Sequence, residues 1–80
     1  MSNNIQQGIW YWKSNKHPAS NYEPDTWRPY TTAENAILEK AWNEKQNTAG
    51  VGDYVVDFRR GIQYKLSDHT KTRPIKRETF

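Results

Sequence analysis

The chain has 80 residues, of which 34% are hydrophobic and 14% aromatic, and its formal net charge is +3. A chain of this length forms one small domain and buries only about 60% of its unfolded surface. Its four tryptophans and five tyrosines can each bury roughly 150–250 Å², which predicts a folded domain with an aromatic core. The absence of cysteine excludes disulfides and Cys-ligated zinc. No apolar run approaches the ~20 residues of a membrane span.

Charge is unevenly distributed along the chain. Residues 1–58 carry five Lys/Arg against seven Asp/Glu, and residues 59–80 carry seven against two, which gives −2 and +5. The basic last third indicates an anionic partner or a solvated basic face. His17 and His69 are isolated, so we expect no metal site and no cofactor.

The N-terminal segment, residues 1–7, is polar and has neither the basic start nor the apolar core of a secretory signal. We therefore expect a disordered tail at 1–7, a single monomeric domain over 8–80, and an intracellular location, nuclear or cytoplasmic. The aromatic run at 9–12 predicts the first strand. Residues 13–26 contain turn formers and two prolines, which predicts a long loop.

A short strand is predicted at 27–30, where Pro29 indicates an edge position or a bulge. The helix is predicted over residues 33–45, because Thr31 and Glu34 form a capping-box pattern at its start. The spacing of the apolar residues predicts one buried stripe, formed by Ile37, Leu38, Ala41 and Trp42. Residues 47–50 are expected to continue as a loop.

The second half of the chain contains two alternating segments, 54–58 and 62–66, joined by a short glycine-containing connection. This pattern predicts an antiparallel hairpin. Within it, Gln63 occupies the outward phase of its strand, opposite Ile62 and Tyr64. A polar turn over 67–72 and a final strand over 73–77 complete an α+β fold, in which a meandering antiparallel sheet carries one helix.

Five separated signals occur in the order of a known family: Trp10, Trp27, Glu39, the segment from Tyr54 to Gln63, and Arg73. The chain resembles the WWE family, named for two tryptophans and a glutamate, over nearly its whole length. The resemblance implies a curved, half-open antiparallel β-sheet with one α-helix packed across it. The loop at 13–26 is longer than the turn usual there, and any contact that relatives make through residues beyond position 80 would be missing or replaced.

The resemblance also implies a ligand, the iso-ADP-ribose unit inside poly(ADP-ribose) or a terminal ADP-ribose. An indole can stack on adenine, a glutamine amide can donate to and accept from its edge, and an arginine fork suits phosphate. Two tyrosine hydroxyls can add donors to the phosphates. Transferred position by position, the ligand-binding residues are Tyr11, Trp27, Tyr54, Gln63 and Arg73. The remaining tryptophans (Trp10, Trp12 and Trp42) are expected in the core, and Glu39 is expected to bond backbone or basic groups.

No nucleophile–base pair, metal cluster or phosphate-binding glycine loop occurs in the sequence, so we expect no enzyme. The leading hypothesis is a non-catalytic reader of poly(ADP-ribose) or ADP-ribosylated proteins. In the WWE family such domains usually accompany ubiquitin-ligase or ADP-ribosyltransferase modules. Two alternatives stay open: a binder of single-stranded RNA or other nucleic acid, and a protein-interaction domain with a degenerate pocket.

Overall fold

The computed structural model describes residues 7–19 and 22–80. The predicted disordered tail, residues 1–7, lies outside the described part except for Gln7, so it stays a prediction. One helix and six strands follow in this order: β1 (Gly8–Lys13), β2 (Trp27–Pro29), α1 (Thr32–Asn43), β3 (Thr48–Val51), β4 (Tyr54–Asp57), β5 (Ile62–Lys65) and β6 (Asp68–Thr79).

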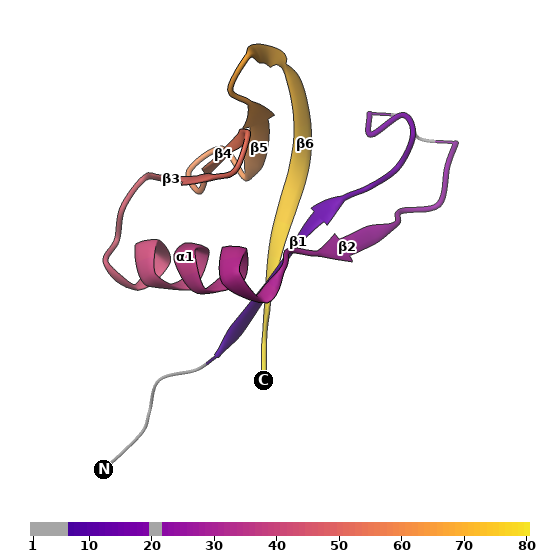
Figure 1. Cartoon of the computed structure of the whole chain (residues 1–80). Coiled ribbons are helices and arrows are strands. Elements are labelled where there is room, and N and C mark those ends of the chain that lie inside the picture. The colour runs from indigo at the N-terminus through magenta and orange to yellow at the C-terminus, as the bar shows by residue number, and fades with distance from the viewer. Residues whose placement is uncertain (1–6, 20–21) are drawn as a thin grey trace.

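The strands form one antiparallel sheet in the order β2-β1-β6-β5-β4-β3, with β2 and β3 at its two edges. The long β6 runs through the whole molecule, and α1 lies across one face of the sheet (Figure 1). The N-terminal part of β6 pairs with β5, and residues 75–79 pair with β1. The sheet is not closed into a barrel, because its edge strands do not pair with each other. The predicted α+β fold with a half-open antiparallel sheet is confirmed.

Two segments differ from the prediction. Residues 48–51, predicted as loop, form the edge strand β3, in which Ala49 and Val51 are buried. The predicted turn at 67–72 largely belongs to β6, which begins at Asp68. In both segments pairing with the adjacent strand of a hairpin, β4 for residues 48–51 and β5 for residues 68–72, outweighs a weak local preference.

Helix α1 begins with the predicted capping box. The backbone N–H of Glu34 donates to Thr31 Oγ1 over 3.2 Å, and the N–H of Thr31 donates to Glu34 Oε1 over 3.0 Å. The predicted four-residue stripe is only half right: Leu38 and Ala41 are buried, whereas Ile37 is 47% and Trp42 is 42% exposed. The helix covers a narrow strip of the sheet, so only the residues at i and i+3 are enclosed.

The core consists of seven buried side chains from five elements and their ends: Trp10, Tyr30, Leu38, Ala41, Ala49, Val51 and Val56. Trp10 is enclosed as predicted, and Trp12 is half-buried beside this core. Trp42 packs edge-on against Trp10, with ring centroids 5.4 Å apart, although it is not enclosed itself.

Glu39 has the structural role that the sequence predicted. Its carboxylate accepts from Gly8 N (2.9 Å), Trp10 Nε1 (2.6 Å) and the guanidinium of Arg77 (2.7 and 2.9 Å). The hydrogen bond from Arg77 is the main reason that the pKa of Glu39 lies below its usual value, although burial opposes the shift. This one side chain therefore connects the helix to β1 and β6.

Candidate functional site

A cavity of about 390 Å³ lies on the helix side of the sheet, where the two edge strands leave the structure open. Its residues come from both halves of the sheet and from the start of α1. Its lining includes Trp12, Arg28, Tyr30, Glu34, Val51, Tyr54, Gln63 and Arg73. Strand pairing explains why distant residues meet here: Gln63 is the direct partner of Arg73, and Tyr54 is the direct partner of Val51. Direct antiparallel partners project from the same face.

Gln63 lies in this wall with only 4% of its surface exposed. The alternating pattern predicts an outward position for Gln63, and that prediction is wrong. Ile62 and Tyr64 are half-buried on the opposite face. The apolar residues of β5 thus lie on the face away from the core, and alternation in this strand indicates the wrong face as the inner one.

The amide of Gln63 is held in one orientation by Tyr30, whose hydroxyl donates to Gln63 Oε1 over 2.6 Å. Burial raises the pKa of Tyr30, and the Glu34 carboxylate raises it further, so the hydroxyl remains a donor at neutral pH. Because a tyrosine donor fixes the amide oxygen, the amide nitrogen Nε2 is the atom left to donate to a ligand. Gln63 thus presents an N–H group to an acceptor in the cavity.

Arg73 divides its donors between the protein and the cavity. Its Nη1 donates to the carbonyl oxygens of Lys13 (3.0 Å) and Asn15 (2.6 Å), which anchors the long loop. The guanidinium lies 5.6 Å from the ring centroid of Trp12. Within residues 7–19 and 22–80 no acceptor is recorded for Nε and Nη2. An arginine fixed along one edge and open along the other is suited to a phosphate oxygen pair.

Tyr54 completes the donor set of the cavity. It is 39% exposed, and its hydroxyl has no recorded partner in the described part of the chain. Arg28 and Arg73 contribute two positive charges to the lining, against the single carboxylate of Glu34. The arrangement therefore combines an aromatic wall, a fixed amide N–H and a net positive charge, which fits an anionic ligand with a flat aromatic part.

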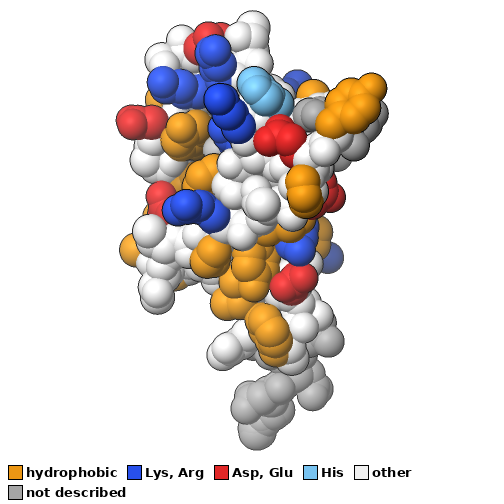
Figure 2. All heavy atoms as spheres, turned by 90° about the vertical axis from the view of Figure 1, so that its right-hand side faces the viewer, with side chains coloured by type: hydrophobic (Ala, Val, Ile, Leu, Met, Phe, Trp, Pro, Cys, Tyr) orange, Lys and Arg blue, Asp and Glu red, His pale blue; other side chains and the backbone are white. Residues whose placement is uncertain are grey.

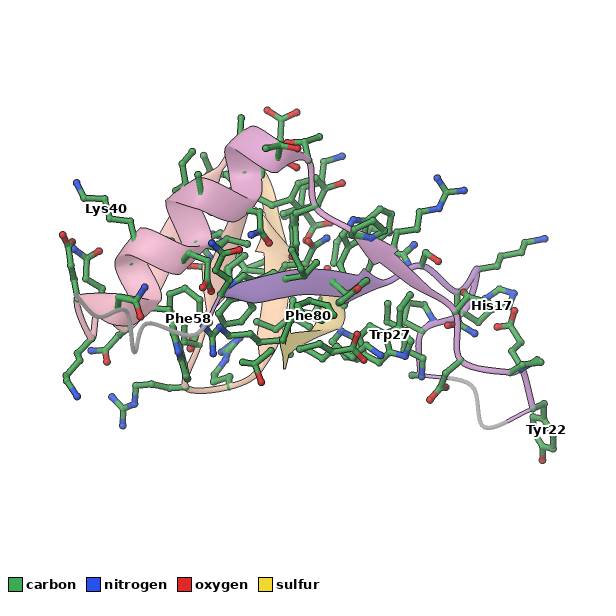
Figure 3. All side chains as sticks on the ribbon, turned by 90° about the horizontal axis from the view of Figure 1, so that it is seen from below. His17, Tyr22, Trp27, Lys40, Phe58 and Phe80 are labelled. Carbon is green, nitrogen blue, oxygen red and sulfur yellow. The ribbon has the colours of Figure 1, made fainter. Side chains whose placement is uncertain are left out.

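Tyr11 and Trp27 are not brought together with the other three predicted residues. They flank Lys76, whose Nζ lies 5.3 Å from the ring centroid of Tyr11 and 4.7 Å from that of Trp27. Figure 3 shows Trp27 on the side of β1 away from α1. Tyr11 pairs with Lys76, and alternation along β1 places both on the face opposite Trp12.

Trp12 and Arg28 line the cavity instead, although neither is among the predicted site residues. These two residues are direct partners across β1 and β2, so they share the inner face. The signal that could have identified Trp12 is its spacing of two from Trp10. Residues i and i+2 of a strand lie on the same face, and Trp10 is buried in the core, so Trp12 also faces inward. Three consecutive aromatic residues at 10–12 concealed this periodicity.

Among the described residues, no group of three or more His, Cys, Asp or Glu side chains could hold a metal ion. Within the same residues, α1 is not long and apolar enough to cross a membrane.

Comparison with protein families gives one result that covers nearly the whole chain. The family model described as the WWE domain matches residues 8–77. A comparison with curated proteins gave no match. The matched residues include every side chain that lines the cavity.

Proposed function

Because the chain belongs to the WWE family of non-catalytic interaction domains, we propose that its cavity reads ADP-ribose units. The ligand class is poly(ADP-ribose) or an ADP-ribosylated protein, which the domain meets inside the cell. The adenine lies in the cavity between Val51 and Trp12, and a phosphate group lies at Arg73 and Tyr54.

The observation that carries this proposal is the fixed orientation of Gln63. Gln63 lines the cavity, and because Tyr30 occupies Oε1, Nε2 is the atom left to donate to a ligand there. Adenine offers ring nitrogens as acceptors on its edges, which match a glutamine N–H. The hydrogen bond from Tyr30 orders the amide before a ligand binds, which lowers the entropy cost of recognition.

The phosphate part of the ligand is supported by Arg73. Its guanidinium is already ordered by two backbone carbonyls and by Trp12, so binding needs little further ordering of the side chain. Pre-ordering of this kind raises affinity by lowering the entropy cost of association. Tyr54 adds an O–H donor on the neighbouring strand.

The experiment is a calorimetric titration with ADP-ribose, iso-ADP-ribose, adenosine and a short RNA. We expect micromolar binding of an ADP-ribosyl ligand, about −8 kcal/mol, much weaker binding of adenosine, and a shallow salt dependence. A steep salt dependence with tighter RNA binding would show a nucleic-acid binder, because many phosphates would be contacted. No binding of any ligand in the panel would leave the protein-interaction alternative.

A matched pair of variants tests the cavity itself. Tyr54→Phe removes one hydroxyl from the cavity, and we expect affinity for ADP-ribose to fall about 2- to 10-fold, the value of one hydrogen bond. Tyr64→Phe is the control, because Tyr64 belongs to the same sheet, faces the other way and packs on His69 with centroids 4.5 Å apart. Equal losses in the two variants would contradict the assignment.

A further inference from the structure

A second cavity of about 440 Å³ adjoins the first. Tyr54, Gln63 and Arg73 line both cavities, so these three side chains form the wall that the two spaces share. The remaining lining comes from the long loop after β1 and from the β5–β6 hairpin: Lys16, Pro18, Lys65, Thr70, Lys71 and Thr72. We call this space the loop-side cavity.

The loop that bounds this cavity has an ordered base. Asn15 is 4% exposed, its Nδ2 donates to the carbonyl of Pro24 over 2.6 Å, and its Oδ1 accepts from Thr26 N over 2.9 Å. The backbone N–H of Ser14 donates to the carbonyl of Thr26 over 2.8 Å, and Arg73 binds the Asn15 carbonyl. Lys16 follows this clamp directly, so its backbone is held at the mouth of the loop-side cavity.

The lining of the loop-side cavity carries four positive charges and no carboxylate. The cations are Lys16, Lys65, Lys71 and Arg73, and Figure 2 shows Lys and Arg side chains gathered in the upper part of the face that the loop presents. The first cavity differs, since Glu34 lies in its wall. Four cations around one concave space attract an anionic group, and lysine suits phosphate as a point charge.

We infer that the loop-side cavity is a second anion subsite, which binds a further phosphate group of the ligand that occupies the first cavity. This inference rests on the proposed function, because the two cavities meet at Arg73. A ligand with phosphates on both sides of its adenosine fits this arrangement, and the long loop extends the recognised length of the polymer beyond one nucleotide unit.

The test compares two ligands and two double variants. The ligands are ADP-ribose and a dimer of ADP-ribose, and the variants are Lys16→Ala/Lys71→Ala and the control Lys40→Ala/Arg59→Ala. Lys40 and Arg59 are exposed and line neither cavity, and the control removes the same two charges. Affinities are measured by calorimetry, and circular dichroism checks that each variant is folded.

We expect the wild-type domain to bind the dimer more tightly than ADP-ribose. The Lys16→Ala/Lys71→Ala variant should lose about 3- to 10-fold of dimer affinity, the value of two partly exposed charge pairs, with ADP-ribose affinity changed less than about twofold. The control should change neither affinity by more than about twofold. Unchanged dimer affinity in the test variant, or an equal loss in the control, would overturn the subsite but leave the proposed function intact. If the wild type bound neither ligand, the proposed function would fail and the subsite with it.

Discussion

Replacing Tyr30 with phenylalanine tests the contact that orients Gln63. The substitution keeps the ring and removes a hydroxyl that lies 2.6 Å from Gln63 Oε1. Because both residues are buried, water cannot readily replace the lost donor, and the expected cost is about 1–3 kcal/mol of unfolding free energy. A domain of this length has a total of about 4–12 kcal/mol, so the variant stays folded and its melting temperature falls by roughly 5–20 °C.

A double-mutant cycle isolates the pair from other effects of the substitution. Gln63→Met leaves the Tyr30 hydroxyl without its acceptor, whereas Tyr30→Phe/Gln63→Met replaces both polar groups with apolar ones of similar size. Removing both partners of a buried hydrogen bond is close to neutral, so the double variant should be more stable than the sum of the single losses predicts. We expect a coupling free energy of about 1–2 kcal/mol from urea unfolding.

Binding provides the second readout of the same substitution. Without the Tyr30 hydroxyl the Gln63 amide can rotate, so the folded Tyr30→Phe variant should bind ADP-ribose about 3- to 10-fold more weakly, the value of one oriented hydrogen bond. Additive stability losses within about 0.5 kcal/mol, together with unchanged affinity, would refute the claim that Tyr30 holds Gln63 for the ligand.

Three further predictions concern residues outside that pair. Tyr11→Phe and Trp27→Ala should change the affinity for ADP-ribose by less than about twofold, because both residues lie on the face away from the cavity. A tenfold loss of affinity in calorimetry would instead place the site on that face. Gly8→Ala should lower unfolding free energy by about 1–3 kcal/mol, because a Cβ there overlaps the Arg77 guanidinium, and an unchanged urea midpoint would contradict this. Folding lowers the pKa of Glu39, so the ionised carboxylate contributes to stability at pH values above its ordinary pKa of 4.5. This contribution is lost as the pH falls through the pKa of the folded state. Melting temperatures between pH 3 and 7 should therefore depend less on pH in Glu39→Gln than in the wild type.

Much of the fold follows from local patterns that the sequence displays directly. The capping box at Thr31 and Glu34 fixes the start of the helix, and alternation over residues 54–66 identifies the central hairpin. Both signals arise from interactions between residues close in sequence. The family resemblance also predicts Tyr54, Gln63 and Arg73 as site residues, and these three side chains lie together in the wall that two adjoining cavities share.

The face on which a side chain lies was harder to predict. In β1 the residues at 10–12 are all aromatic, so no polar residue marks the outer face, and Tyr11 could not be distinguished from Trp12. In β5 the outer face carries half-buried Ile62 and Tyr64, so Gln63 has the sequence pattern of a solvated residue. The face of the sheet that α1 covers decides these orientations, and that packing is tertiary information.

The shared strand β6 determines how the domain unfolds. One segment of it pairs with the β3–β5 half of the sheet and the next pairs with β1. Side-chain contacts such as Trp10–Phe58 and Tyr30–Gln63 join the two halves, so melting of either half removes packing partners of the other. Unfolding should therefore be a single cooperative transition, with amide exchange in both halves governed by the same global opening. A ligand held at Arg73, in the middle of this strand, would then stabilise the entire domain. At a ligand concentration of 100 Kd the free energy of unfolding would increase by about 2.7 kcal/mol, and the melting temperature would rise accordingly.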